Sequence, residues 1–179
     1  MVNLYRTSKF FPALILLLIF SSCAQMKSEL SPPRQYPAAG KPQKVIDFYN
    51  AELKKHPQDR VLIKEYVKSL EEIKVAADKA SGREDFATAC KTYHVLLQNY
   101  PDFKDFAHLL SFNRAQLNSR LTKCKTALYK KGFQEYRAGN LNEAISLWQD
   151  YLTIDPNNTD IKKALNTAKK QQKNLQQKK

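Results

Sequence analysis

The sequence predicts an all-α protein built from helical hairpins. Only four of the 179 residues are glycine, and the body of the chain is rich in alanine, leucine, lysine and glutamine, which favours helices over sheets. Beyond residue 42, apolar residues recur at spacings of three and four, as on a helix with one buried face. Short turn signals separate these stretches. We therefore expect about six helices, stacked as hairpins into an α–α superhelix.

The N-terminus has the pattern of an export signal. A basic segment over residues 1–9 precedes an unbroken apolar run over residues 10–20, and Ser21-Ser22-Cys23 follows. Such a run is short for a membrane-spanning helix, which needs about 20 apolar residues. We therefore expect residues 1–22 to be a signal peptide that is removed.

The segment Phe20-Ser21-Ser22-Cys23 resembles the lipobox of bacterial lipoproteins. The resemblance implies cleavage before Cys23 and its modification with acyl chains such as palmitate, several of which together anchor a protein stably. Ala24 stands where an aspartate retains many such proteins in the inner membrane, so the resemblance implies the outer membrane, facing the periplasm. The alternatives are a cleaved soluble protein, in which Cys23 is incidental, and an uncleaved anchor.

A flexible tether is expected over residues 23–42. Within it, residues 24–41 contain three prolines and a glycine and show no apolar periodicity. Fully extended, it would hold a folded domain up to roughly 55 Å from a bilayer. The folded domain is expected over residues 43–170, followed by a basic polar tail over residues 171–179.

Three helices are expected in the first half of the domain. Each carries an apolar stripe at helical spacing and ends at a proline or a glycine, which disfavour a continuing helix. These helices cover residues 45–53, 61–77 and 86–97, with breaks at Pro57, Gly82 and Pro101.

The second half of the domain begins with a stretch that has two interpretations. Residues 102–131 contain neither glycine nor proline, and an apolar stripe runs along them, which predicts one long helix or two helices joined with little punctuation. Gly139-Asn140 then marks a turn before an amphipathic helix over residues 141–154. A last helix begins near Ile161 and becomes polar on all sides toward its end.

The 34 residues from 125 to 158 resemble a tetratricopeptide repeat. The residues that carry the resemblance are Leu128, Gly132, Gly139, Ala144, Trp148 and Pro156. In this pattern Gly132 and Ala144 let two helices approach closely, and Trp148 fills the space between them.

A weaker copy precedes this repeat by 55 residues. Phe86, Ala89, Tyr93, Leu97 and Pro101 correspond to Leu141, Ala144, Trp148, Leu152 and Pro156. The prolines that close successive units are 44 and 55 residues apart, rather than about 34. The first helices of the earlier units must therefore be longer than in the family.

The resemblance implies a binding site for a protein partner. Tetratricopeptide units commonly bind partner segments along the concave face that their first helices build. The positions carried over are Thr126, Tyr129, Phe133, Tyr136 and Arg137. The rings would supply contact area, and Arg137 would meet a carboxylate. The alternative is that the rings pack against the helical stretch 102–124 or against the last helix.

The two resemblances together imply a non-enzymatic envelope scaffold or adaptor. Its partner would be another envelope protein, since the class includes components of outer-membrane barrel assembly and of pilus secretin assembly. No catalytic constellation, metal-ligand pattern or phosphate-binding loop occurs in the sequence, so we expect no enzyme activity and no cofactor.

Two cysteines remain once Cys23 is assigned to lipid. Cys90 and Cys124 both lie on apolar stripes, and because the periplasm is oxidising, such a pair often forms a disulfide. The alternative is two small buried apolar residues. Cys90 and His94 are one helical turn apart, a spacing that a metal ion can use, but no second pair exists, so no metal site is expected.

The formal net charge of +13 is concentrated at the ends of the chain. Residues 159–179 contain seven lysines and a single acid, whereas residues 43–158 are nearly balanced. This distribution is unlike a nucleic-acid binder, which concentrates bases on a folded face. The alternative function is a cell-wall-associated structural or regulatory lipoprotein, whose tail contacts anionic lipid or peptidoglycan. The tail is otherwise a solvated helix end.

Overall fold

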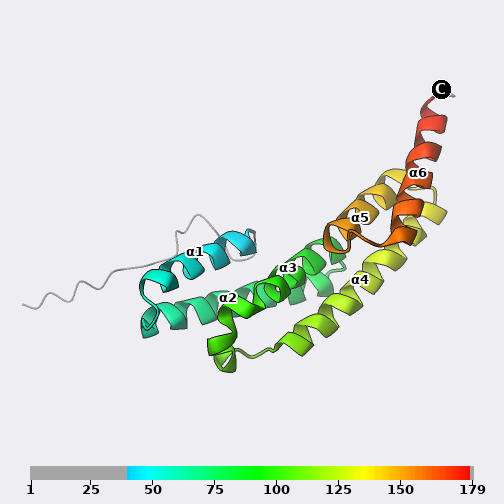
Figure 1. The fold of residues 1–179 in the computed structure, drawn as a ribbon. Coiled ribbons are helices and arrows are strands. Elements are labelled where there is room, and N and C mark those ends of the chain that lie inside the picture. Colours follow the sequence, from blue (N-terminus) through cyan, green and yellow to red (C-terminus); the bar gives the residue numbers. More distant parts are fainter. Residues whose placement is uncertain (1–39, 178–179) are drawn as a thin grey trace, which may run out of the picture.

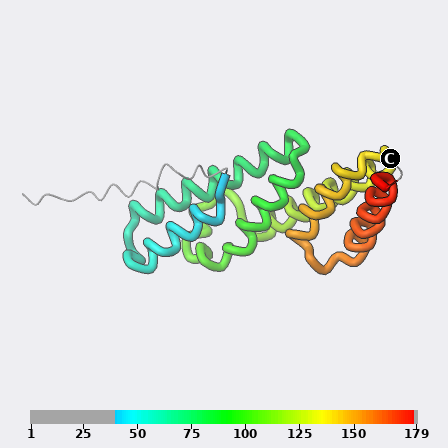
Figure 2. The backbone as a smooth tube through the Cα atoms, turned by 90° about the horizontal axis from the view of Figure 1, so that it is seen from above, coloured from blue at the N-terminus to red at the C-terminus, as the bar shows by residue number. Residues whose placement is uncertain are grey.

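The computed structural model describes residues 40–177, and every regular element in this range is helical (Figure 1). The elements are α1 (Pro42–Lys55), α2 (Arg60–Gly82), α3 (Phe86–Gln98), the 3-10 helix η1 (Tyr100–Leu109), α4 (Arg114–Arg137), α5 (Leu141–Ile154) and α6 (Thr159–Gln177). Each α-helix packs against the next along the chain, so the molecule is an elongated stack from α1 to α6 (Figure 2). The predicted all-α repeat architecture is confirmed.

Several sequence expectations fall on the ends of the chain. The expected signal peptide and Cys23 lie outside the described residues, as do most of the expected tether and residues 178–179. The expected tail is continuous with the domain as far as the structure describes it, because α6 runs past residue 170 to Gln177. Within residues 40–177, none of the helices is both long and apolar enough to cross a bilayer.

Aspartate side chains fix where α2 and α3 begin. Asp59 Oδ1 accepts hydrogen bonds from the backbone N–H groups of Val61 at 2.9 Å and Leu62 at 3.1 Å. Asp85 Oδ1 accepts one from the N–H of Thr88 at 3.2 Å. These contacts satisfy donors that the first turn of a helix leaves without an intrahelical partner, so each helix starts at a defined residue.

The stretch without glycine or proline contains two separate elements. η1 ends at Leu109, Leu110 is extended, and α4 begins after Asn113. Asn113 Oδ1 accepts from the N–H of Gln116 and Gln116 Oε1 accepts from the N–H of Asn113, both at 2.9 Å. This reciprocal capping box starts α4 without any helix breaker, so the interpretation as two joined helices is the correct one.

The correspondence between residues 55 positions apart extends beyond the second helices of the two hairpins and includes their turns. In the units α2–α3 and α4–α5, the turns hold the two described residues with positive φ, Glu84 at 60° and Gly139 at 82°. Asp85 and Asn140 follow them as the residues that precede α3 and α5. The two turns therefore share one backbone conformation, which only the second unit builds with glycine.

Buried positions correspond between the two units as well. Ala89 and Ala144 are fully buried, as are their neighbours Tyr93 and Trp148 on the same helices. On the first helices, Gly132 corresponds to Ala77. A Cβ atom on Gly132 would lie 2.7 Å from Cδ1 of Trp148, so the wider indole ring requires glycine there. The first unit combines alanine with the smaller ring of Tyr93.

Aromatic rings fill the N-terminal end of the core. The rings of Tyr49 on α1 and Tyr66 on α2 stack with centroids 4.9 Å apart. Phe103 and Phe106 of η1 lie 6.3 and 5.4 Å from the Tyr66 ring. η1 therefore covers this end of the core by contact with α2. The sequence analysis of residues 102–131 did not predict this contact.

Candidate functional site

The residues carried over as a binding site all lie on the second half of α4. The buried residues of this helix include Cys124, Leu128 and Gly132, which face α3 and α5. At about 100° per residue, Thr126, Phe133 and Arg137 point roughly opposite to Leu128. Thr126 and Arg137 are exposed, and Phe133 is half-buried.

The aromatic residues lean on α5. The Phe133 ring lies 4.8 Å from Tyr129 and 4.9 Å from Trp148, and the Tyr136 ring lies 5.6 Å from Trp148. Tyr129 is 6.3 Å from the ring of Tyr151. The rings therefore pack against the second helix of their own unit, α5, and not against the helical stretch 102–124 or the last helix as the alternative expectation had it. Each stays partly accessible from one side.

A hollow of about 470 Å³ opens along this part of α4. Its lining residues are Tyr129, Lys130, Phe133, Gln134 and Arg137, which we call the α4 face. Tyr136 and Thr126 lie outside the lining. Sequence reasoning missed Lys130 and Gln134, although both fall in the same helical phase as Arg137, which was the available signal.

Positive charge dominates the α4 face. Lys130 has no ion-pair partner among residues 40–177, and the same holds for Arg137 and for Lys123 one turn before the hollow. Arg137 Nε donates to the backbone oxygen of Phe133 at 3.3 Å, which ties the guanidinium to the preceding turn of α4. The face can thus hold an apolar group against the rings and an acidic group against the cations.

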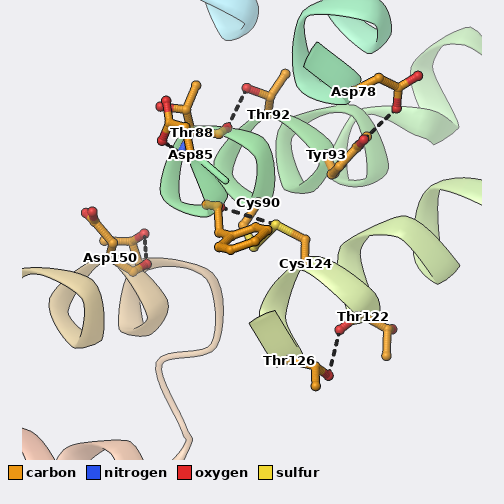
Figure 3. Close-up of a disulfide and its surroundings, with 12 residues drawn as sticks. Asp78, Asp85, Thr88, Cys90, Thr92, Tyr93, Thr122, Cys124, Thr126 and Asp150 are labelled. Atoms are coloured by element: carbon orange, nitrogen blue, oxygen red, sulfur yellow. Dashed lines mark hydrogen bonds between the residues drawn. A yellow bond between two sulfur atoms is a disulfide. The ribbon is translucent and has the colours of Figure 1, made fainter. Parts of the chain in front are cut away.

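A disulfide fixes α4 against the preceding unit. Cys90 on α3 and Cys124 on α4 are bonded, with Cα atoms 5.6 Å apart, and both side chains are buried (Figure 3). This Cα separation is ordinary for a disulfide. Because Cys90 carries no free thiol in this state, the Cys90–His94 spacing offers no thiolate to a metal ion.

Asp78 on α2 contacts both α3 and α4, and Figure 3 shows its hydrogen bond with Tyr93 of α3. Its carboxylate accepts from the Tyr93 hydroxyl at 2.5 Å and pairs with Lys74 at 2.8 Å and Arg120 at 2.7 Å. Partial burial would raise the pKa of Asp78, but these hydrogen bonds and cations outweigh it and hold the pKa below its usual value. Burial, with the nearby carboxylate, raises the pKa of Tyr93 to about 12. The network ties α2, α3 and α4 together by charge.

The family model for the tetratricopeptide repeat matches residues 78–102 and 126–158. The first segment covers the end of α2 and all of α3, and the second covers the second half of α4 and all of α5. Neither a curated protein nor a solved structure matches the chain. The two matches support a tetratricopeptide-like repeat domain, and with it a role in protein–protein interaction.

Proposed function

We propose that this chain is a non-enzymatic, lipid-anchored adaptor of the bacterial envelope that binds another envelope protein through the α4 face. The observation that carries the binding proposal is the hollow between Phe133 and two cations without ion-pair partners. Half-buried rings bind a partner at little entropic cost because neighbouring side chains already hold them. Cations at the rim select an acidic partner and speed its encounter.

The anchoring proposal rests on the N-terminal sequence. Phe20-Ser21-Ser22-Cys23 places a cysteine directly behind small residues and an apolar run. Lipid on Cys23 and a tether would hold the repeat domain near a membrane, with the outer membrane favoured by Ala24. An adaptor in this position fits the assembly of outer-membrane, secretion or pilus complexes, where partners must be held at one surface.

The binding proposal is tested by charge reversal on the α4 face. The tagged full-length chain is crosslinked in living cells, captured and analysed by quantitative mass spectrometry. Lys130→Glu and Arg137→Glu should each reduce recovery of the partner about tenfold, as expected when like charges meet at an interface. Arg114→Glu is the matched control, because it reverses an exposed charge on the same helix outside the hollow.

Equal recovery with all three variants would place the partner elsewhere on the molecule. Failure to recover any protein reproducibly with the unaltered chain would contradict the adaptor function itself.

The anchor is tested separately at Cys23. Metabolic labelling with palmitate should mark the unaltered chain, and Cys23→Ser should abolish the label and release the protein from the membrane fraction. A Cys23→Ser chain that keeps the label would refute lipidation at this residue.

A second candidate function uses the end of α6. Lys169, Lys170 and Lys173 are exposed and have no ion-pair partner among the described residues. Each lysine near an anionic bilayer contributes about 1 kcal/mol of attraction. These charges favour a cell-wall-associated role on peptidoglycan or anionic lipid.

This role predicts that replacing the three lysines with glutamine abolishes cosedimentation with purified peptidoglycan and with anionic vesicles. The control replaces three exposed lysines of α1 and α2 and so removes the same charge: Lys54, Lys68 and Lys79. Loss of binding with the control as well would mean that only net charge matters.

A further inference from the structure

A second hollow lies at the opposite end of the molecule from the α4 face. It has a volume of about 690 Å³ and is formed by the end of α1, the first two turns of α2 and η1. Most of its surface is apolar. We call it the η1 cleft.

Two strips of side chains with the same spacing flank the η1 cleft. On α2 the strip is Arg60, Ile63, Lys64 and Val67, and on η1 it is Asp102, Asp105, Phe106 and Leu109. On the α-helix α2, residues spaced by three, four and seven share one face. On the 3-10 helix η1, residues three apart eclipse, so Asp102 aligns with Asp105 and Phe106 with Leu109. Each strip therefore presents two apolar and two charged side chains to the same cleft, and His108 of η1 also lines it.

The apolar part of the η1 cleft is open to water. Leu109 is 53% exposed, and Phe106 is half-buried with its ring 5.4 Å from the ring of the fully buried Tyr66. The cleft is thus an outward continuation of the hydrophobic core. A partner that covers these apolar side chains would remove their surface from water, which favours binding.

The two strips carry opposite charges. Arg60 and Lys64 make the α2 side basic, and Asp102 and Asp105 make the η1 side acidic. Within residues 40–177, Arg60, Lys64 and Asp105 form no ion pair, while Asp102 accepts a hydrogen bond from Asn50 at 3.0 Å. The cleft holds its two signs of charge apart instead of pairing them.

We propose that the η1 cleft binds a second copy of this chain. In a two-fold dimer the same patch faces itself, so the basic side of one copy meets the acidic side of the other. The apolar side chains then pack in the middle, and both pairs of charges are satisfied across the contact. The proposal goes beyond the adaptor function and does not rest on it, because the α4 face takes no part in the contact.

Charge exchange between two tagged copies tests the dimer. Full-length chains with two different C-terminal tags are coexpressed, extracted in detergent and captured through one tag, and the second tag is quantified. Lys64→Glu in both copies should lower co-capture about tenfold, and so should Asp105→Lys in both copies. All four side chains that define the two charged sides are exposed, so these variants keep the core intact.

The decisive sample combines Lys64→Glu in one copy with Asp105→Lys in the other, which restores opposite charges on both sides and should return co-capture to the unaltered level. The double variant Lys64→Glu/Asp105→Lys in both copies should do the same. Lys79→Glu, an exposed α2 residue outside the cleft, is the control and should leave co-capture unchanged.

Three results would overturn the proposal. These are the absence of co-capture for the unaltered chain, full co-capture with both single reversals, and loss of co-capture that neither the mixed pair nor the double variant restores. The last result would assign the cleft to a different protein. None of them bears on the α4 face, so the adaptor proposal stands or falls by its own test.

Discussion

At Gly132, the lack of a side chain lets α4 approach the indole ring of Trp148. The equivalent pair in the preceding unit is Ala77 and Tyr93, both fully buried, in which alanine takes the place of glycine and a phenol ring that of the indole. The two units thus solve one packing problem with two matched pairs of residues. Replacing only one residue of a pair with its counterpart from the other unit should therefore impair the packing.

We expect Gly132→Ala to lower the free energy of unfolding by about 1 kcal/mol. Overpacking a core costs about 1–3 kcal/mol, and the gain in helix propensity of about 1 kcal/mol recovers only part of this. Adding Trp148→Tyr reproduces the pair of the first unit, so the double variant should lose less stability than the sum of the two single variants. Urea denaturation measures all three, and strict additivity would show that the two positions are independent.

The two turn residues with positive φ should respond in opposite directions to substitution. Glu84→Gly should stabilise the protein by about 0.5–1 kcal/mol, because an L-residue is strained in the left-handed region. Gly139→Ala should destabilise it by about 1–2 kcal/mol for the same reason, although no neighbouring atom lies within 4 Å of the added Cβ. Thermal unfolding checks both, and a change of the same sign in both variants would contradict this account.

At the scale of elements, the start of α4 depends on the Asn113–Gln116 capping box. Asn113→Ala should lower stability by about 1 kcal/mol, because it removes the acceptor for the Gln116 N–H. Hydrogen exchange should increase in the first turn of α4 and stay unchanged at its C-terminal end. Asn118→Ala, an exposed site within the same helix, is the control. Equal effects of both changes would indicate a loss of general helix stability.

The sequence predicted the helices that end at a glycine or a proline. It also predicted the close packing of α4 against α5, from the small residues Gly132 and Ala144 and the large Trp148. Both hairpin turns and the 55-residue correspondence of buried residues fall in this group. It did not distinguish one helix from two over residues 102–131, since a capping box of Asn113 and Gln116 reads as ordinary polar sequence. The 3-10 form of η1 was also missed, because the spacing of its apolar residues does not distinguish it from an α-helix. The η1 cleft was missed with it.

For the candidate site on α4, the resemblance supplied residue positions and not the shape of the surface. Phe133 and Arg137, two of the positions carried over from the family, both line the hollow on α4. Whether a half-buried ring leaves a hollow depends on the helix opposite, which sequence spacing cannot describe. The sequence therefore could not show that the Tyr136 ring lies against Trp148. Tyr136 was among the expected binding residues, but it does not line the hollow. Likewise, the spacing of Cys90 and Cys124 says nothing of their separation in space.

At the scale of the whole molecule, the disulfide joins units that also meet through side-chain packing, the Asp78 network and the ion pair between Lys91 and Asp150. The cysteines are 34 positions apart, and closing a loop of that length is worth about 3–4 kcal/mol in the chain-entropy model. We therefore expect reduction to lower the free energy of unfolding by about this amount, measured by urea denaturation with and without reductant. The Cys90→Ala/Cys124→Ala variant should show no further effect of reductant. A reductant effect in that variant would mean that another bond is responsible.

The same bond changes how the molecule would respond to mechanical tension applied at its two ends. Force would pass from α3 directly into α4 through the bridged sulfur atoms, so residues 91–123 would lie in a closed loop outside the line of pull. At about 3.3–3.6 Å per residue, that loop withholds roughly 110 Å of extension from the chain. A protein held at a membrane by one end and loaded by a partner near the other would lengthen by that much less before its covalent backbone became taut.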